Sequence, residues 1–414
     1  MTNNEFPTRE QLPENEDSNK SRPQVTLITI FLAYLQVGVT AFGMAILQKL
    51  KALVMNNHWL SEEEMNEGLA MVQLYPGPLM VDFTAYVGYK LRGVFGAILA
   101  TVGFILPSFV LMSVLSAFYF AAGSLPWVHP LFLGLEALVV GVLFNVTLDM
   151  GVRNLQGKTQ AVIMVLAFAA LLFKVNAVLI VLVALAIGAF LIRPAVGKNI
   201  TADKPAPKIE PFSVKRWVSI GVVVLVIFAV VALAWSLKSE IGQLALSLFE
   251  IGSVAFGNGS AIIPLIQAEV VDSHHWLTLS QFADGVALGQ ITPGPFLITA
   301  TFIGYKMAGF WGGLLATFAI FSLSFAMTLA FTEIFARIRN LKPVRGALAG
   351  VMASFVGLLA VVLLQLGGVA LTTPAALALA MAAFIGVRYF KIDILWVFLG
   401  GLAVWGGLMA IGLI

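Results

Sequence analysis

The chain has 414 residues, of which 60% are hydrophobic and only 11% charged, and it carries 38 glycines, a composition far from that of a soluble domain and typical of an integral membrane protein. The formal net charge of +3 is small for this length and is explained by Lys and Arg in loops, so it does not indicate a nucleic-acid partner. The sequence contains no cysteine, which excludes disulfides and thiolate metal sites.

Residues 1–24 are polar and lack the apolar segment of a signal peptide, which predicts a flexible tail. Apolar runs close to the ~20 residues that a spanning helix needs then recur along the chain, for example Val218 to Trp235, Phe310 to Phe331 and Leu395 to Ile414. We therefore expect an all-α integral membrane protein with about 11 to 13 transmembrane segments in a lipid bilayer.

One pair of segments indicates an internal duplication. The stretch "HWLSEEEMNEGLAMVQLYPGP" runs from His58 to Pro78, and "HWLTLSQFADGVALGQITPGP" runs from His275 to Pro295. Trp, Gln and Pro-Gly-Pro agree in register, and the agreement extends upstream to a Phe-Gly pair and downstream to Gly-Tyr-Lys in each half. Chance similarity between apolar segments would give scattered Leu and Ala matches instead, so we interpret the chain as two repeats.

The two repeats are predicted to have opposite orientations in the membrane. The segment between them is polar and rich in proline and Lys, which indicates a cytoplasmic linker, and an extra helix at about Trp217 to Leu237 follows it. The loop "AAGSLPWVHP" in the first half corresponds to the basic "ARIRNLKPVR" in the second, as inversion requires. The predicted organisation is a tail over 1–24, a first transmembrane repeat over 25–193, a linker over 194–216 and a second repeat with its extra leading helix over 217–414.

This inversion also predicts where the termini lie. Counting the crossings places the N-terminus in the cytoplasm and the C-terminus outside, in the plasma (inner) membrane.

A capping box opens each copy of the repeated motif, formed by Ser61 with Glu64 and by Thr278 with Gln281. A helix should begin there and run about four turns before the prolines, too short to cross a bilayer alone. We therefore expect a broken or re-entrant helix at each Pro-Gly-Pro.

Proline cannot continue a helix but is favoured in its first turn, so Pro-Gly-Pro should end one helix and begin another. The new helix starts present unsatisfied backbone N–H groups and the positive end of a dipole, which favour an anion. Two inverted copies can meet near the midplane and bind a small oxyanion, helped by amide donors. The alternative is that the prolines only kink two packed helices. The candidate substrate-binding residues are Gln73, Pro76, Gly77, Pro78, Gln290, Pro293, Gly294, Pro295, Phe42, Gly43, Phe256, Gly257 and Asn258.

Carboxylates within apolar segments are costly and therefore candidates for function. Asp82 and Glu250 are the candidate proton-coupling residues, because both lie within about two turns of the expected site. The alternative is an interfacial position or a structural hydrogen bond. The four histidines are not spaced as metal ligands on one helix face, so we expect no metal and no cofactor.

At these motifs the sequence resembles the chromate ion transporter (CHR) family in its long, two-domain form. The resemblance covers Phe-Gly, Trp-Leu-Ser/Thr, Gln-x-x-Pro-Gly-Pro, Gly-Tyr-x-x-x-Gly and "FILPSF" (Phe104 to Phe109). It implies a carrier that exports chromate by proton-linked exchange, with sulfate as a competing oxyanion. After the turns, the sequence reads "PGPLMVD" and "PGPFLIT", more apolar than the Pro-Gly-Pro-Asn-Ser-Thr that long members often carry, so both anions stay candidates.

The leading interpretation is a secondary active transporter that works by alternating access between two inverted repeats, with an oxyanion and protons as partners and a homodimer as a further expectation. An anion channel is the main alternative. An intramembrane lipid-modifying enzyme would need Glu67 and Asp284 as acid and base, yet no nucleophile accompanies them. We therefore do not expect an enzyme.

Overall fold

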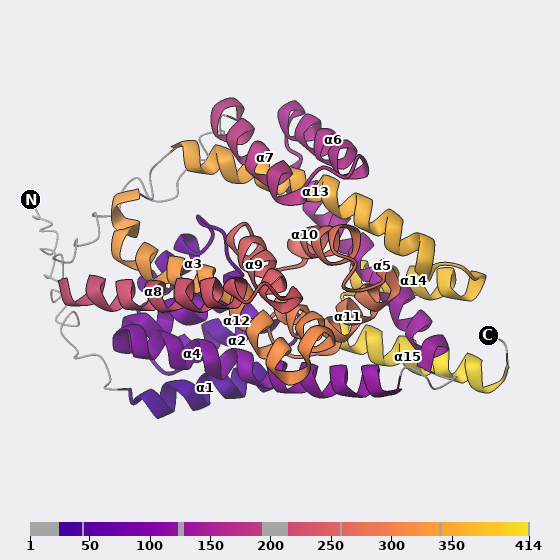
Figure 1. The fold of residues 1–414 in the computed structure, drawn as a ribbon, viewed down its shortest axis with the longest axis horizontal. Helices are drawn as coiled ribbons and strands as arrows, with labels where there is room; N and C mark the ends of the chain where they lie inside the picture. The colour runs from indigo at the N-terminus through magenta and orange to yellow at the C-terminus, as the bar shows by residue number, and fades with distance from the viewer. Residues whose placement is uncertain are drawn as a thin grey trace, which may run out of the picture.

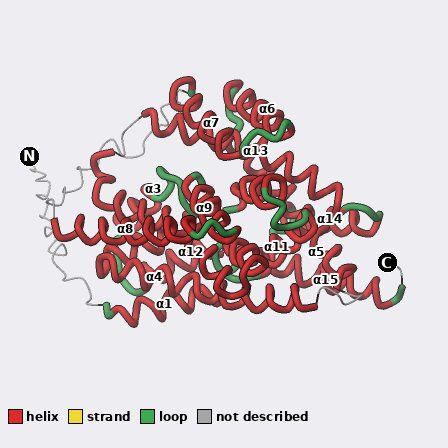
Figure 2. The backbone as a smooth tube through the Cα atoms, viewed as in Figure 1, coloured by secondary structure: helices red, strands yellow, loops and turns green. Residues whose placement is uncertain are grey.

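The computed structural model describes residues 25–43, 45–122, 128–192, 214–256, 259–338 and 342–412. Every regular element within these ranges is helical (Figure 2). The first half contains α1 (Leu27–Thr40), α2 (Ala45–Asn56), α3 (Glu62–Met71), α4 (Leu79–Ala122), α5 (Val128–Asn154), α6 (Lys158–Leu172) and α7 (Ala177–Leu191). The second contains α8 (Val214–Ser236), α9 (Glu240–Ser253), η2 (Ser260–Ile262), α10 (Ile263–Gln267), η3 (Ala268–Ser273), α11 (Leu279–Ile291), η4 (Phe296–Ile298), α12 (Thr299–Ile338), α13 (Lys342–Ala370), α14 (Pro374–Arg388) and α15 (Ile394–Ala410).

Parts of the predicted organisation lie outside the described residues. They are the N-terminal tail, most of the linker, and the candidate site residues Gly257 and Asn258. The extra leading helix is described as α8, in the place where the sequence predicts it.

The same unusual backbone geometry occurs at matching positions of the two halves. His58 and His275, the first residues of the repeated motif, have positive φ angles of 52° and 54°. Further along, Gly93 inside α4 has φ 61° and ψ −150°, and Gly309 inside α12 has φ 57° and ψ −147°. Both halves therefore bend the chain in the same way at the same places.

Both predicted capping boxes are present. Ser61 accepts a hydrogen bond from the Glu64 amide and Glu64 accepts one from the Ser61 amide, and Thr278 and Gln281 do the same at the start of α11. The helices that follow end before the prolines, at Met71 and at Ile291. We call residues 72–78 the first break and residues 292–295 the second break.

The long helices α4 and α12 are each two helices joined at a sharp bend. At the bend in α4, the chain folds back on itself and brings Gly88 against Gly96. The approach is so close that a Cβ atom, which glycine lacks, would overlap the backbone carbonyl of Gly96 if Gly88 carried one. Gly304 and Gly312 have the same relation in α12. The absence of side chains at these glycines lets the two arms approach closely, as small residues do in membrane helix pairs.

The helices form two bundles, and each bundle contains elements of both halves (Figure 1). The first bundle is built by α1, α4, α8, α9 and α12; the second is built by α5, α6, α7, α13, α14 and α15. In the second bundle, α5 of the first half packs on α13, α14 and α15 of the second half, and α13 packs on α5, α6 and α7 of the first half. A Cβ atom at Gly141 of α5 would overlap the carbonyl of Ala380 in α14, and one at Gly357 of α13 would overlap that of Met164 in α6.

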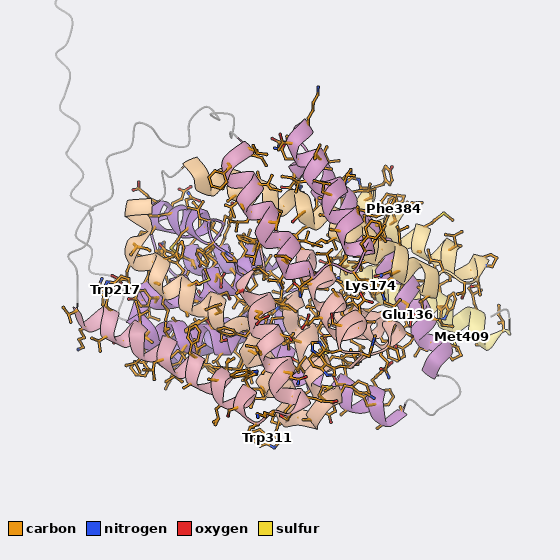
Figure 3. All side chains as sticks on the ribbon, turned by 45° about the horizontal axis from the view of Figure 1, so that its top comes forward. Glu136, Lys174, Trp217, Trp311, Phe384 and Met409 are labelled. Atoms are coloured by element: carbon orange, nitrogen blue, oxygen red, sulfur yellow. The ribbon has the colours of Figure 1, made fainter. Side chains whose placement is uncertain are left out.

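Helix length and composition agree with a membrane protein. Within the described residues, five helices are long and apolar enough to cross a membrane, and five further apolar helices have 10–17 residues. Large apolar side chains also face outward, for example Trp311, which is 74% exposed and lies at the edge of the molecule in Figure 3. Such outward-facing apolar side chains suit contact with lipid. The prediction of an all-α membrane protein is confirmed.

Candidate functional site

A buried carboxyl group lies against the first break. Asp82, in the first turn of α4, is 0% exposed, and its side chain lies so close to Gly77 that a Cβ atom there would overlap Oδ2. The same Cβ atom would lie 2.9 Å from Cβ of Ser324, on the second arm of α12. Gly77 therefore leaves room for both side chains, one from each half.

The surroundings of Asp82 are hydroxyl groups. Ser324 and Thr328 of α12 face the carboxyl group, and Tyr75 lies near it in the first break. The Tyr75 hydroxyl is 2.7 Å from Thr328 Oγ1. The side chains of Tyr75, Ser324 and Thr328 are all buried. Tyr75 also packs on Phe331 with ring centroids 4.6 Å apart. The first break is thus fixed against α12.

The second break is fixed against the first half in the corresponding way. Ser108 on the second arm of α4 donates a hydrogen bond of 2.5 Å to the Pro293 carbonyl, and a Cβ atom at Gly294 would overlap Ser108 Oγ. The Gly294 amide donates to the Ala41 carbonyl at the end of α1, at 3.0 Å. Gly294 has φ +98°, in the region that favours glycine.

These contacts are reciprocal. "FILPSF", which contains Ser108, corresponds in the second half to "IFSLSF" (Ile320 to Phe325), which contains Ser324 at the same place. Each serine therefore contacts the Pro-Gly-Pro turn of the other half. The sequence motif contains Ser108, but nothing in it indicates that the partner is a turn in the other half.

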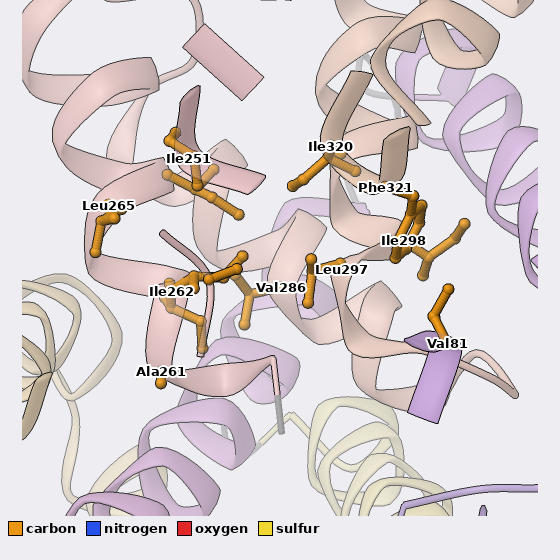
Figure 4. Close-up of a cluster of buried hydrophobic side chains, with 14 of the residues drawn as sticks. Val81, Ile251, Ala261, Ile262, Leu265, Val286, Leu297, Ile298, Ile320 and Phe321 are labelled. Atoms are coloured by element: carbon orange, nitrogen blue, oxygen red, sulfur yellow. The ribbon is translucent and has the colours of Figure 1, made fainter. Parts of the chain in front are cut away.

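The two helix starts after the breaks meet in one apolar cluster. Val81 of α4, Leu297 and Ile298 of η4, and Phe321 of α12 belong to the same group of buried side chains (Figure 4). Val81, Leu297 and Ile298 are at most 1% exposed. The helix starts that follow the two breaks therefore lie close together, and apolar side chains fill the space beside their first turns.

The other predicted substrate-binding residues have different environments. Pro78, Pro293 and Pro295 are buried, whereas Pro76 is half-buried. Gln73 lies beyond the end of α3 with an exposed side chain, and Gln290 lies in the last turn of α11, half-buried.

The Phe-Gly pairs differ as well. Phe42 and Gly43 follow Ala41, so they lie next to the second break, and Phe256 is buried after α9. A Cβ atom at Gly43 would lie 3.9 Å from Oδ2 of Asp393, the N-cap of α15.

Glu250, the second proton-coupling candidate, is exposed on α9 and has Glu269 as its charged neighbour. It is not part of the cluster around Asp82.

A second group of buried carboxyls connects the halves at α11. Tyr119 of α4 donates a hydrogen bond of 2.6 Å to Asp284 Oδ2, and Ser280 donates one of 2.5 Å to Glu136 Oε1 on α5. Glu136 also faces Asp284, and the exposed fractions are 1% and 3%. No sequence pattern joins these residues, because they lie on three helices from two halves.

The chromate transporter family model matches residues 28–189 and 242–406, most of each half. The chain belongs to the chromate transporter family. Both matched regions include a break, and the family points to a transporter rather than an enzyme. Thus the resemblance seen in the motifs is confirmed, as is the multi-pass membrane character.

Three relatives of this family member are similar over most of their length. An uncharacterized transporter of Methanocaldococcus jannaschii is 32% identical, over 84% of this chain and 86% of its own. A probable chromate transport protein of Synechococcus elongatus is 32% identical, over 74% and 76%. A chromate transport protein of Cupriavidus metallidurans is 30% identical, over 81% of each. No solved structure matches.

Proposed function

We propose that the protein is a secondary active transporter that exports an inorganic oxyanion, with chromate as the first candidate and sulfate-like anions as the second. The names of the relatives from Synechococcus and Cupriavidus support chromate. The structural observation that carries the proposal is the reciprocal contact of each Pro-Gly-Pro turn with a serine of the other half, because it joins two broken helices into one region. Transporters commonly bind substrates where such helices meet.

The proposal includes an inverted duplication. Its support is the matching element order of the two halves, the shared bends at Gly93 and Gly309, and the additional helix α8, which among the described residues is the one helix between them without a counterpart in the first half. One additional crossing reverses the second half, with the N-terminus in the cytoplasm and the C-terminus outside the plasma membrane. Two such repeats provide the inward-open and outward-open states of alternating access. A homodimer stays part of the proposal.

The proposed oxyanion ligands are the backbone amides at the helix starts, with Gln73 and Gln290 as additional donors and the Phe-Gly pairs beside them. At the second break the Gly294 amide is engaged by the Ala41 carbonyl, so the available donors are the first amides of η4, those of Phe296 and Leu297. Proton coupling is assigned to Asp82 and Glu250. Of these two residues, Asp82 is the stronger candidate because it is buried beside the first break.

Transport by purified protein in liposomes tests this function. Chromate, sulfate, molybdate and phosphate flux would be measured with and without an imposed proton gradient. We expect one oxyanion to be driven by the proton gradient, whereas a channel would follow only the gradient of the anion itself. No flux of any of the four would refute an oxyanion transporter.

The double variant Gln73→Ala/Gln290→Ala tests the site. We expect it to abolish oxyanion flux at normal expression, because two amide donors are lost. Gln243→Ala is the matched control, since Gln243 is an exposed glutamine on α9. Flux equal to that of the control would remove both glutamines from the site.

A further inference from the structure

The two breaks share their Pro-Gly-Pro sequence but not their chemistry. In the first, Asp82 lies against Gly77. In the second, the corresponding residue is Thr299, which donates a hydrogen bond of 3.2 Å to the Phe296 carbonyl of its own helix. The first turns of η4 and α12 contain no acidic residue. Of the two helix starts that follow the breaks, only the first therefore carries a carboxyl group.

Within the described residues, the groups that interact favourably with an ionised Asp82 carboxyl are two neutral hydroxyls, those of Ser324 and Thr328, and no cation. Neither oxygen accepts a hydrogen bond within the described residues, although both are buried. Both hydroxyls also have backbone acceptors on α12: Ser324 donates to the Phe321 carbonyl at 3.1 Å, and Thr328 donates to the Ser324 carbonyl at 3.0 Å.

The groups that face Asp82 are all uncharged. They are Tyr75 from the break and Ser324 and Thr328 from α12, and the ion pairs of the described residues do not include Asp82. A buried, unpaired carboxylate costs several kcal/mol, whereas a protonated carboxyl does not carry that cost. A proton bound to Asp82 would remove this cost.

We propose that Asp82 makes the helix start after the first break a proton-binding site, which narrows the ligand set given above: the oxyanion then binds at the second break, with Gln290 as its amide donor, and Gln73 is not a ligand. This deepens the proposed function and rests on it. The step is simple: the carboxylate accepts one proton and no other bond changes. An ionised Asp82 at this helix start would repel an oxyanion, so the two breaks bind unlike ligands within one symmetric framework.

Asp82→Asn tests the division, because it keeps the size of the side chain and cannot bind the proton. Purified protein in liposomes would be assayed for labelled chromate binding, for chromate–chromate exchange and for accumulation driven by a pH gradient. One coupled proton changes the accumulation ratio about tenfold per pH unit. We expect the variant to retain binding and exchange and to lose this dependence on the gradient.

Asp149→Asn is the control, since Asp149 is 39% exposed in ion pairs with arginines. It should keep the tenfold dependence. If Asp82→Asn loses chromate binding while it elutes as a folded protein, or keeps the gradient dependence, the division is wrong and the transporter proposal stands. If wild-type protein transports none of the four oxyanions, the proposed function itself fails.

Two measurements keep the test valid if Asp82→Asn does not fold. Asp82→Thr places the residue of the second break in the first, and it should give the same result as Asp82→Asn. The infrared spectrum of wild-type protein at neutral pH should also contain the C=O stretch of a protonated carboxyl. That band should be weaker in the spectrum of either variant. Absence of such a band from the wild-type spectrum would overturn the proposal even if oxyanion transport is found.

Discussion

Replacing Gly294 by alanine tests the packing of the second break against the first half. The backbone conformation at φ +98° costs an alanine about 1–3 kcal/mol. The new methyl group also overlaps Ser108 Oγ, so the 2.5 Å hydrogen bond from Ser108 to the Pro293 carbonyl is lost as well. Loss of that bond adds about 0.5–1.5 kcal/mol and overpacking adds about 1–3 kcal/mol.

Gly309→Ala is the matched control for this substitution. Gly309 has φ +57°, but a Cβ atom there meets nothing within 4 Å, so only the backbone cost applies. We expect Gly294→Ala to lose about 1.5–4.5 kcal/mol more than Gly309→Ala. Unfolding of the detergent-solubilised variants, followed by tryptophan fluorescence, measures the difference. In a double-mutant cycle, Ser108→Ala should reduce the cost of Gly294→Ala. Equal losses for the two glycine variants would refute the contact.

Two further predictions concern polar contacts outside the breaks. Tyr119→Phe removes the donor to Asp284 Oδ2 and should lower stability by about 1–3 kcal/mol, because it leaves a buried acceptor unsatisfied; the thermal midpoint measures this loss. The comparison is Tyr305→Phe, at a tyrosine of α12 whose ring stacks on Phe120, and equal midpoints for the two variants would contradict the prediction. Asp149→Ala removes the carboxylate that pairs with Arg153 at 2.7 Å and Arg388 at 3.4 Å. Because these groups are partly exposed, it should cost less than about 1 kcal/mol, and the cost should shrink in high salt; a larger, salt-independent loss would contradict this.

The sequence predicts the local parts of the site well. Capping boxes and prolines act through hydrogen bonds within one or two turns, so Ser61 and Thr278 locate the helix starts that the structure contains. The contacts of Ser108 and Ser324 were not predictable in this way, because they depend on which helix of one half packs on which turn of the other. The orientation of Gln73 is a similar case: α3 ends at Met71, and the side chain becomes exposed.

The two bundles bear on how such a transporter could move. Rocking of one half against the other would separate Gly141 from Ala380 and Gly357 from Met164, contacts between the halves in which backbones touch without intervening side chains. Motion of one bundle against the other preserves all of these contacts, because each bundle already contains both halves. Helix α11 packs on α4 and α12 in the first bundle and on α5 and α13 in the second. The second break follows α11 directly, so a movement between the bundles changes its surroundings, while the symmetric contacts inside each bundle stay intact.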